Sequence, residues 1–201
     1  MKNLIAHRGL KKNSKENTLA AFKEALENNY YAGFECDVRT TKDNVFVICH
    51  NPIYKGKIIS LTPYHDLEDI PSLEHVLNLK SSKIILLELK EINCNVEKLN
   101  DVLKRFSHQN IYVMSFYNGL IKTLKAKNAK IKVGVLNYVL NSEESYLHYD
   151  FICLLENIMT NGLYSYFTLQ NKEIFIYNIH HLKEMTTKYK KSYFITDEVV
   201  E

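Results

Sequence analysis

Short apolar runs alternate along the whole chain with longer segments whose apolar residues recur at helical spacing. In segment 18–28, Leu19, Phe22 and Leu26 fall on one helix face, and Asn17 or Thr18 can cap the first turn. The same criterion predicts five further helices, at 72–79, 96–106, 120–127, 163–171 and 181–190. The apolar runs between the helices are short enough to be buried strands.

Eight of these apolar runs are expected to form the strands of one sheet. They lie near residues 5, 36, 86, 112, 133, 153, 175 and 194, and a further run at 45–49 is expected to extend the second strand as a hairpin. Strands that alternate with helices pair in parallel, so eight such units predict an α/β fold, a shortened (β/α)8 TIM barrel. The weakest unit is 136–149, with at most two helical turns. A doubly wound open sheet is the competing architecture.

Composition and charge exclude several classes of protein. The length of 201 residues suits a single domain over 1–201, and the net charge of +3 is too small to indicate a nucleic-acid partner. The four cysteines form no CxxC or CxxH pair, which excludes a zinc knuckle and a thioredoxin motif. No apolar run reaches the length of a signal peptide or membrane span, so we expect a soluble cytoplasmic protein with reduced thiols.

Acidic residues cluster at the expected carboxyl ends of the strands, where the loops of a barrel meet at one mouth. Glu35 and Asp37 lie two apart on a strand and therefore point to one face, and Glu88 ends the next strand of the barrel. Three carboxylates without a cysteine predict a site for one hard divalent cation, Mg²⁺ or Ca²⁺, rather than zinc. The alternative is a solvated acidic face that forms salt bridges with Arg39 and Lys42.

Two histidines, His7 and His50, end strands beside this acidic group, and His7 is followed directly by Arg8. Acid–base catalysis on a phosphate ester needs such a pair, one group to take a proton and one to protonate the leaving oxygen. Further polar residues at strand ends are Lys90, Ser115, Thr196 and Asp197. The other histidines are expected to be structural or exposed: His65, His75, His108, His148, His180 and His181.

Several short motifs follow one another in a specific order, mostly within the first 90 residues: His7-Arg8-Gly9, Glu16-Asn17-Thr18, Glu35-Cys36-Asp37-Val38, Thr41-Lys42-Asp43, Val47-Ile48-Cys49-His50, Ile70-Pro71-Ser72-Leu73, Leu87-Glu88-Leu89-Lys90, then Ser115-Phe116 and Ile195-Thr196-Asp197. This combination resembles the glycerophosphodiester phosphodiesterase family. The resemblance implies a TIM barrel of the phosphatidylinositol-phospholipase-C-like type. It also implies an enzyme of lipid and glycerol metabolism that cleaves glycerophosphodiesters, with a divalent cation, to glycerol 3-phosphate and an alcohol.

Roles for individual residues follow from the resemblance. His7 and His50 would be the acid–base pair, and which of them is the base stays open. The metal ligands would be Glu35, Asp37 and Glu88.

Three further residues would serve the substrate. Arg8 and Lys90 would contact the phosphate, and Glu16 would order the first loop or form a hydrogen bond near the substrate. The partner is thus a small-molecule phosphodiester.

The chain departs from the family pattern at three places. Asn51 follows His50 where the family usually has aspartate, and Ile176-Tyr177-Asn178 stands where the family has a tryptophan motif. The insertion at 52–70 is short, which predicts a more open pocket.

Three other functions remain as alternatives. The first is a phosphodiesterase of a larger substrate, such as a lysophospholipid or a glycerol-phosphate polymer. The second is a non-catalytic binding barrel that keeps its metal. The third is a nucleic-acid binder, suggested by the lysines in 122–132 and 188–191, although no aromatic stacking pattern accompanies them.

Overall fold

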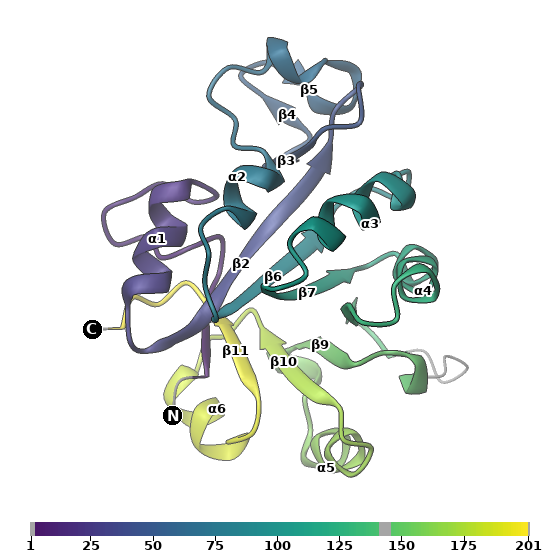
Figure 1. Cartoon of the computed structure of the whole chain (residues 1–201). Helices are drawn as coiled ribbons and strands as arrows, with labels where there is room; N and C mark the ends of the chain where they lie inside the picture. The colour runs from purple at the N-terminus through teal and green to yellow at the C-terminus, as the bar shows by residue number, and fades with distance from the viewer. Residues whose placement is uncertain (1–2, 141–145, 201) are drawn as a thin grey trace.

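The structure is a computed structural model that describes residues 3–140 and 146–200. Within these residues, eight parallel strands close into a barrel (Figure 1), in the order β1-β11-β10-β9-β8-β7-β6-β2. Because β1 pairs with both β11 and β2, the predicted barrel is confirmed and the open sheet is wrong. The strands are β1 (Leu4–Ala6), β2 (Tyr31–Thr40), β6 (Ile84–Leu89), β7 (Asn110–Ser115), β8 (Lys132–Asn137), β9 (Phe151–Leu155), β10 (Glu173–Tyr177) and β11 (Tyr193–Thr196).

The helices surround the barrel on its outside (Figure 1), and each predicted helical segment overlaps one, although α4 and α5 begin two residues earlier than predicted. They are α1 (Leu19–Glu27), α2 (Leu73–Leu77), α3 (Val96–Arg105), α4 (Asn118–Lys127), α5 (Asn161–Leu169) and α6 (Leu182–Lys188). Thr18 is the cap of α1, since its hydroxyl accepts a hydrogen bond from the backbone nitrogen of Ala21. None of the helices described is both long and apolar enough to cross a membrane.

The connection between β8 and β9 is the part that the sequence predicts to be least helical. Its described part contains a single 3-10 turn, η3 (Tyr146–His148), before β9 begins. Residues 141–145 lie outside the described residues, so the prediction of at most two helical turns is tested only in part.

Two apolar layers hold the barrel together. Successive side chains on a strand point to opposite faces, so Leu86 packs inside the barrel whereas Leu87 packs between the sheet and the helices. The interior layer includes Phe151 and Phe175, whose ring centroids are 4.9 Å apart. This interior is a packed core, and the cavity described below opens above it, at the carboxyl ends of the strands.

A small excursion follows β2 and leads to the mouth of the barrel. The predicted hairpin is confirmed: β3 (Phe46–Ile48) pairs antiparallel with the end of β2. The next residues form β4 (Ile53–Tyr54), β5 (Lys57–Ile58), η1 (Ile59–Leu61) and η2 (Tyr64–Asp66). Val47, Ile59, Leu67 and Ile70 give this excursion an apolar cluster of its own.

The contact between β2 and β6 generates a test of the barrel. A Cβ atom added at Gly33 would lie 2.0 Å from the backbone oxygen of Ile84, so Gly33→Ala should reduce the free energy of unfolding by about 3 kcal/mol. Urea denaturation measures this change. The matched control is Gly119→Ala in α4, where no atom lies within 4 Å of the added Cβ and stability should stay the same or rise. Equal midpoints for Gly33→Ala and wild type would contradict the register of these strands.

Candidate active site

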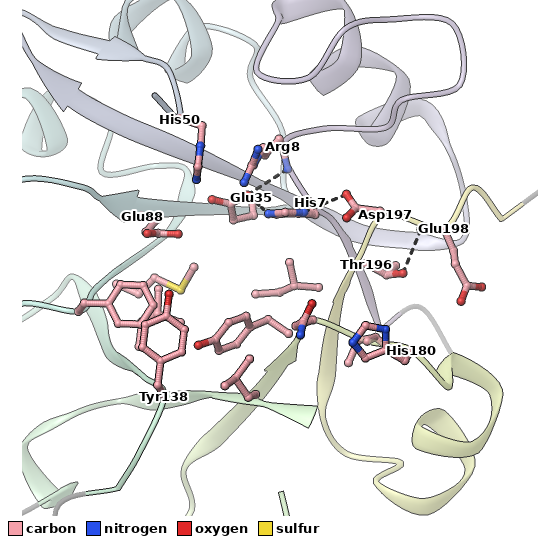
Figure 2. Close-up of a pocket in the computed structure, with 18 of the residues that line it drawn as sticks. His7, Arg8, Glu35, His50, Glu88, Tyr138, His180, Thr196, Asp197 and Glu198 are labelled. Atoms are coloured by element: carbon pink, nitrogen blue, oxygen red, sulfur yellow. Dashed lines mark hydrogen bonds and ion pairs between the residues drawn. The ribbon is translucent and has the colours of Figure 1, made fainter. Parts of the chain in front are cut away.

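A cavity of about 500 Å³ opens at the carboxyl ends of the barrel strands (Figure 2). The side chains that line it differ between the two halves of the barrel. The ends of β1, β2, β3, β6 and β11 contribute charged and titratable groups: His7, Arg8, Glu35, His50, Glu88, Lys90 and Asp197. The ends of β7, β8, β9 and β10 contribute mostly apolar groups: Met114, Phe116, Leu136, Tyr138, Leu155 and Tyr177.

Three carboxylates meet where β2 lies beside β6. Glu35 and Asp37 share the inner face of β2, and Asp37 is directly opposite Glu88 in the strand register. One oxygen from each carboxylate can be chosen so that all three lie within 4.8 Å of one another. Burial, with the charges of Asp37 and Glu88, raises the pKa of Glu35 well above its ordinary value. Burial also raises the pKa of Glu88, although the adjacent Lys90 opposes the shift.

The carboxylate group fits a divalent cation. Glu35 Oε2 accepts a hydrogen bond of 3.0 Å from the backbone nitrogen of Arg8, but Glu35 Oε1 is buried without a hydrogen-bond partner. A buried carboxylate oxygen without a partner is destabilising unless a cation or a donor reaches it. Oxygen ligands from three carboxylates match the preference of Mg²⁺ and Ca²⁺.

Two basic side chains flank the carboxylates. Arg8 Nε lies 3.3 Å from Asp37 Oδ2, and Lys90 Nζ lies 2.6 Å from Glu88 Oε1 and 3.3 Å from Asp37 Oδ1. Burial alone lowers the pKa of Lys90, but Glu88 and Asp37 outweigh it and raise that pKa above its ordinary value. Burial also lowers the pKa of Arg8, but the nearby carboxylates, above all Asp37, outweigh burial and raise that pKa. Both groups therefore stay cationic at neutral pH.

The loop after β1 holds Arg8 and a further polar residue in place. Arg8 and Asn17 both have positive φ angles, 56° and 55°. The buried Asn17 side chain donates to Asp37 Oδ2 at 2.8 Å and accepts from the Asp37 backbone nitrogen at 3.3 Å. Glu16 forms an ion pair with Arg8 at 3.0 Å. Asn17 is thus a supporting residue that the sequence analysis missed, although it lies inside the Glu16-Asn17-Thr18 motif.

His7 is oriented by the last strand of the barrel. Its Nδ1 lies 2.9 Å from Asp197 Oδ1, and its Nε2 lies 4.0 Å from Glu35 Oε2. Hydrogen bonds from His7 and Lys11 lower the pKa of Asp197 well below its ordinary value, so this carboxylate stays ionised. An anionic partner at Nδ1 favours a proton on that nitrogen and leaves Nε2 turned toward the carboxylates.

His50 follows β3 on the other side of the acidic group. Its Nδ1 lies 3.0 Å from Asn51 Oδ1. The residue that replaces the usual aspartate therefore still contacts the imidazole, but through a neutral amide oxygen. In Figure 2, Glu35 lies between the side chains of His50 and His7, and Glu88 lies below His50.

Most of the residues singled out in the sequence come together at this cavity. His7, Arg8, His50 and Lys90 line it with Glu35 and Glu88. Asp37 contacts Arg8 and Lys90 but is not part of the lining, and Glu16 reaches the site through Arg8. Ser115 ends a strand but is buried and donates to the Leu89 carbonyl oxygen at 2.7 Å. His180 is exposed as expected, yet it also lines the cavity. The roles assigned to these residues stay predictions.

The aromatic residues of the cavity were also missed. Phe116, Tyr138 and Tyr177 each stand at or just beyond the carboxyl end of a strand. Their position at strand ends could have indicated that they lie at the mouth of the barrel. In the sequence, however, this position does not distinguish a residue that lines a cavity from one that packs within a loop.

Comparison with known proteins identifies the family. The model of the glycerophosphoryl diester phosphodiesterase family matches residues 7–142, which is more than half of the chain. A glycerophosphodiester phosphodiesterase of Caldanaerobacter subterraneus subsp. tengcongensis is 31% identical over 66% of this chain and 65% of its own. One from Bacillus altitudinis is 30% identical over 73% of this chain and 71% of its own. The chain thus spans about two thirds of the length of these relatives.

Solved structures agree with this match. A glycerophosphodiester phosphodiesterase of Parabacteroides distasonis superposes with a TM-score of 0.82 at 25% identity, covering 97% of this chain and 92% of that one. An Oleispira antarctica phosphodiesterase, solved in complex with the product sn-glycerol-3-phosphate, shares the fold with a TM-score of 0.82 at 19% identity, over 96% and 91% of the two chains. The matched range spans the two histidines and the three carboxylates, and the chain belongs to the glycerophosphoryl diester phosphodiesterase family.

Proposed function

We propose that this protein hydrolyses glycerophosphodiesters to glycerol 3-phosphate and an alcohol, with the help of one divalent cation, Mg²⁺ or Ca²⁺. The observation that supports it best is one cavity in which two histidines lie beside Glu35 and Glu88, which form a carboxylate triad with Asp37. The names of the curated relatives and the product bound to the Oleispira enzyme support the same substrate class.

Glu35, Asp37 and Glu88 would hold the cation. When bound, the ion supplies Lewis-acid stabilisation of the negative charge on the phosphoryl oxygens. Arg8 and Lys90 add positive charge beside the triad, and their ion pairs with Asp37 and Glu88 hold them there. Groups that are placed in advance where charge builds up stabilise the transition state without reorganising during the reaction.

The two histidines would move the protons. One takes the proton of the glycerol 2-hydroxyl as that oxygen bonds to phosphorus, and the other protonates the alcohol oxygen as its bond to phosphorus breaks. Water then opens the resulting cyclic phosphate with the two roles exchanged, which gives glycerol 3-phosphate. His7 is oriented for this work by Asp197, and His50 by Asn51.

The histidines give the first test of this function. General acid–base catalysis contributes on the order of 10²–10⁴-fold, so His7→Ala and His50→Ala should each reduce turnover of glycerophosphocholine by that factor. Release of glycerol 3-phosphate measures the rate. His148→Ala, at an exposed position of the described chain, is the control and should keep wild-type activity. Wild-type activity in either of the first two variants, with the melting temperature unchanged, would contradict the assignment.

Metal removal gives the second test. The pKa values of Glu35 and Glu88 are raised in the fold, so the metal-free fold favours their neutral forms. Their contribution to stability is therefore fully present below the pKa of the unfolded chain and is lost as the pH rises through the pKa of the fold. In EDTA, Glu35→Gln should therefore melt higher than wild type at pH 8, by about 3 °C or more, and the difference should shrink at pH 5. The control Glu27→Gln changes an exposed carboxylate of α1 and should show no such difference.

Added divalent cation should reverse the order of the melting temperatures of wild type and Glu35→Gln. Millimolar Mg²⁺ or Ca²⁺ should raise the melting temperature of wild type but hardly that of Glu35→Gln, because only the folded wild type offers the complete ligand set. EDTA should abolish hydrolysis. Coincident melting curves with and without cation, together with full activity in EDTA, would exclude the proposed metal site.

A further inference from the structure

The two histidines of the cavity are held in different ways. The ring of His7 contacts an ionised carboxylate from the other end of the chain, Asp197, at 2.9 Å. The ring of His50 contacts Asn51, a neutral side chain of its own loop, at 3.0 Å. Because Asn51 is the next residue in the chain, it moves with His50 and does not fix that ring relative to the carboxylates. The position of His50 therefore depends on how its backbone is attached to the barrel.

The regular pairing of β3 with β2 ends just before His50. The strand β3 itself ends at Ile48, and the backbone nitrogen of Cys49 still donates to the carbonyl oxygen of Asp37 at 3.0 Å. The carbonyl oxygen of His50, in contrast, accepts hydrogen bonds from a side chain. The donors are Arg39 Nε at 2.9 Å and Arg39 Nη2 at 2.6 Å.

Arg39 lies near the end of β2, and its side chain is only 10% exposed. Alternate residues of a strand share a face, so Arg39 continues the face of Glu35 and Asp37. Its guanidinium nevertheless bonds to the His50 backbone and to Glu91. This basic side chain therefore serves the loop that carries the histidine rather than the charge of the triad.

Glu91 fixes the remaining part of the guanidinium. Arg39 Nη1 lies 2.7 Å from Glu91 Oε1, and Glu91 Oε2 accepts from the backbone nitrogen of Thr40 at 2.7 Å. Glu91 belongs to the loop that follows β6. All three nitrogens of Arg39 thus have a partner, and one buried group joins the ends of β2, β3 and β6.

The geometry of this contact decides what it can do. A guanidinium is planar and rigid, so two of its nitrogens on one carbonyl oxygen fix that carbonyl in direction as well as in distance. Hydrogen bonds from a charged donor are also stronger than those between neutral groups. The carbonyl belongs to His50 itself, so the same bonds restrict where the imidazole can lie.

We propose that Arg39 is a positioning residue that holds the backbone of His50 so that its imidazole stays in reach for proton transfer. This inference rests on the proposed function. Arg39 does not line the cavity and would touch neither the substrate nor the cation. It acts through His50.

The first test removes the guanidinium. A misplacement of about 1 Å can reduce a rate on the order of 10²-fold, so Arg39→Ala should lower kcat for glycerophosphocholine by about 10- to 100-fold. KM should change little, because Arg8 and Lys90 have their own contacts with the triad. Millimolar guanidinium chloride should restore part of the rate. Arg39→Lys keeps a positive charge beside Glu91 but lacks the planar fork, so its kcat should lie between those of Arg39→Ala and wild type.

A double variant tests whether the effect passes through His50. In the His50→Ala background, Arg39→Ala should lower the residual kcat no further, because residues that act as one unit are not additive. Guanidinium should also have no effect there. A further tenfold loss in the double variant would overturn the positioning role.

The cation provides a readout that does not depend on turnover. Millimolar Mg²⁺ or Ca²⁺ should raise the melting temperature of Arg39→Ala as much as that of wild type, since Arg39 bonds to none of the three carboxylates. If the shift disappeared together with the activity, Arg39 would act on the metal site, and the role proposed for it would be wrong.

Two variants serve as controls. Arg105→Ala removes a guanidinium that binds Glu74 through two nitrogens, at 3.2 and 2.8 Å, on the surface. It should leave kcat unchanged and should not respond to guanidinium. Glu91→Gln weakens the ion pair of Arg39 but leaves both bonds to His50, so it should lower kcat less than Arg39→Ala does. Equal losses in Arg39→Ala and Glu91→Gln would assign the effect to the ion pair and overturn the proposal.

The outcomes separate this inference from the proposed function. Wild-type kcat in Arg39→Ala, in a preparation whose wild type hydrolyses glycerophosphocholine, would overturn the positioning role and leave the proposed function standing. The same holds for a loss that guanidinium fails to rescue in a variant with the wild-type melting temperature. If Arg39→Ala does not fold, Arg39→Lys decides, and wild-type kcat in that variant would overturn the role. A wild type that hydrolyses no glycerophosphodiester would overturn the proposed function and this inference with it.

Discussion

Mutual repulsion of three carboxylates in a place that excludes water is the constraint on which the rest of the site depends. Glu35 and Asp37 have side chains that are 1% exposed, and Glu88 lies opposite Asp37 on the next strand. Such a group cannot stay fully ionised without nearby positive charge. Arg8 and Lys90 supply part of it directly. A divalent cation would supply the remainder, at the oxygen of Glu35 that has no hydrogen-bond partner.

The barrel makes this arrangement possible because it decides what surrounds the charges. Parallel strands all end at one mouth, so residues far apart in the chain, such as His7 and Asp197, meet there at 2.9 Å. Each strand end occupies a set place around the mouth, and polar strand ends on one arc face apolar ones on the other. The cavity therefore has charged groups on one side and mostly apolar groups on the other.

The strand and helix pattern was predictable because each element is fixed by short-range periodicity. Glu35 and Asp37 alternate with buried outward residues, so their common face follows from the pleat of a strand alone. The order of motifs in the first 90 residues also pointed to the two histidines and the three carboxylates, whose catalytic and metal-binding roles stay predictions. Asn17 and Asp197 could be noticed as polar residues, but their partners were not predictable because each lies across the fold from the group it supports.

What the sequence alone determined is the set of elements and the chemical groups at their ends, because both depend on neighbours within a few residues. Only the tertiary structure decided which groups meet. In the fold, Arg39 donates to the carbonyl oxygen of His50 rather than to the carboxylate triad. The Ser115 hydroxyl donates to the backbone carbonyl oxygen of Leu89 rather than pointing into the cavity. The tertiary structure also gathered Phe116, Tyr138 and Tyr177 into one wall. These contacts depend on the closure of the barrel, because closure sets the distances between the strand ends. A pattern of neighbouring residues in the sequence does not encode those distances.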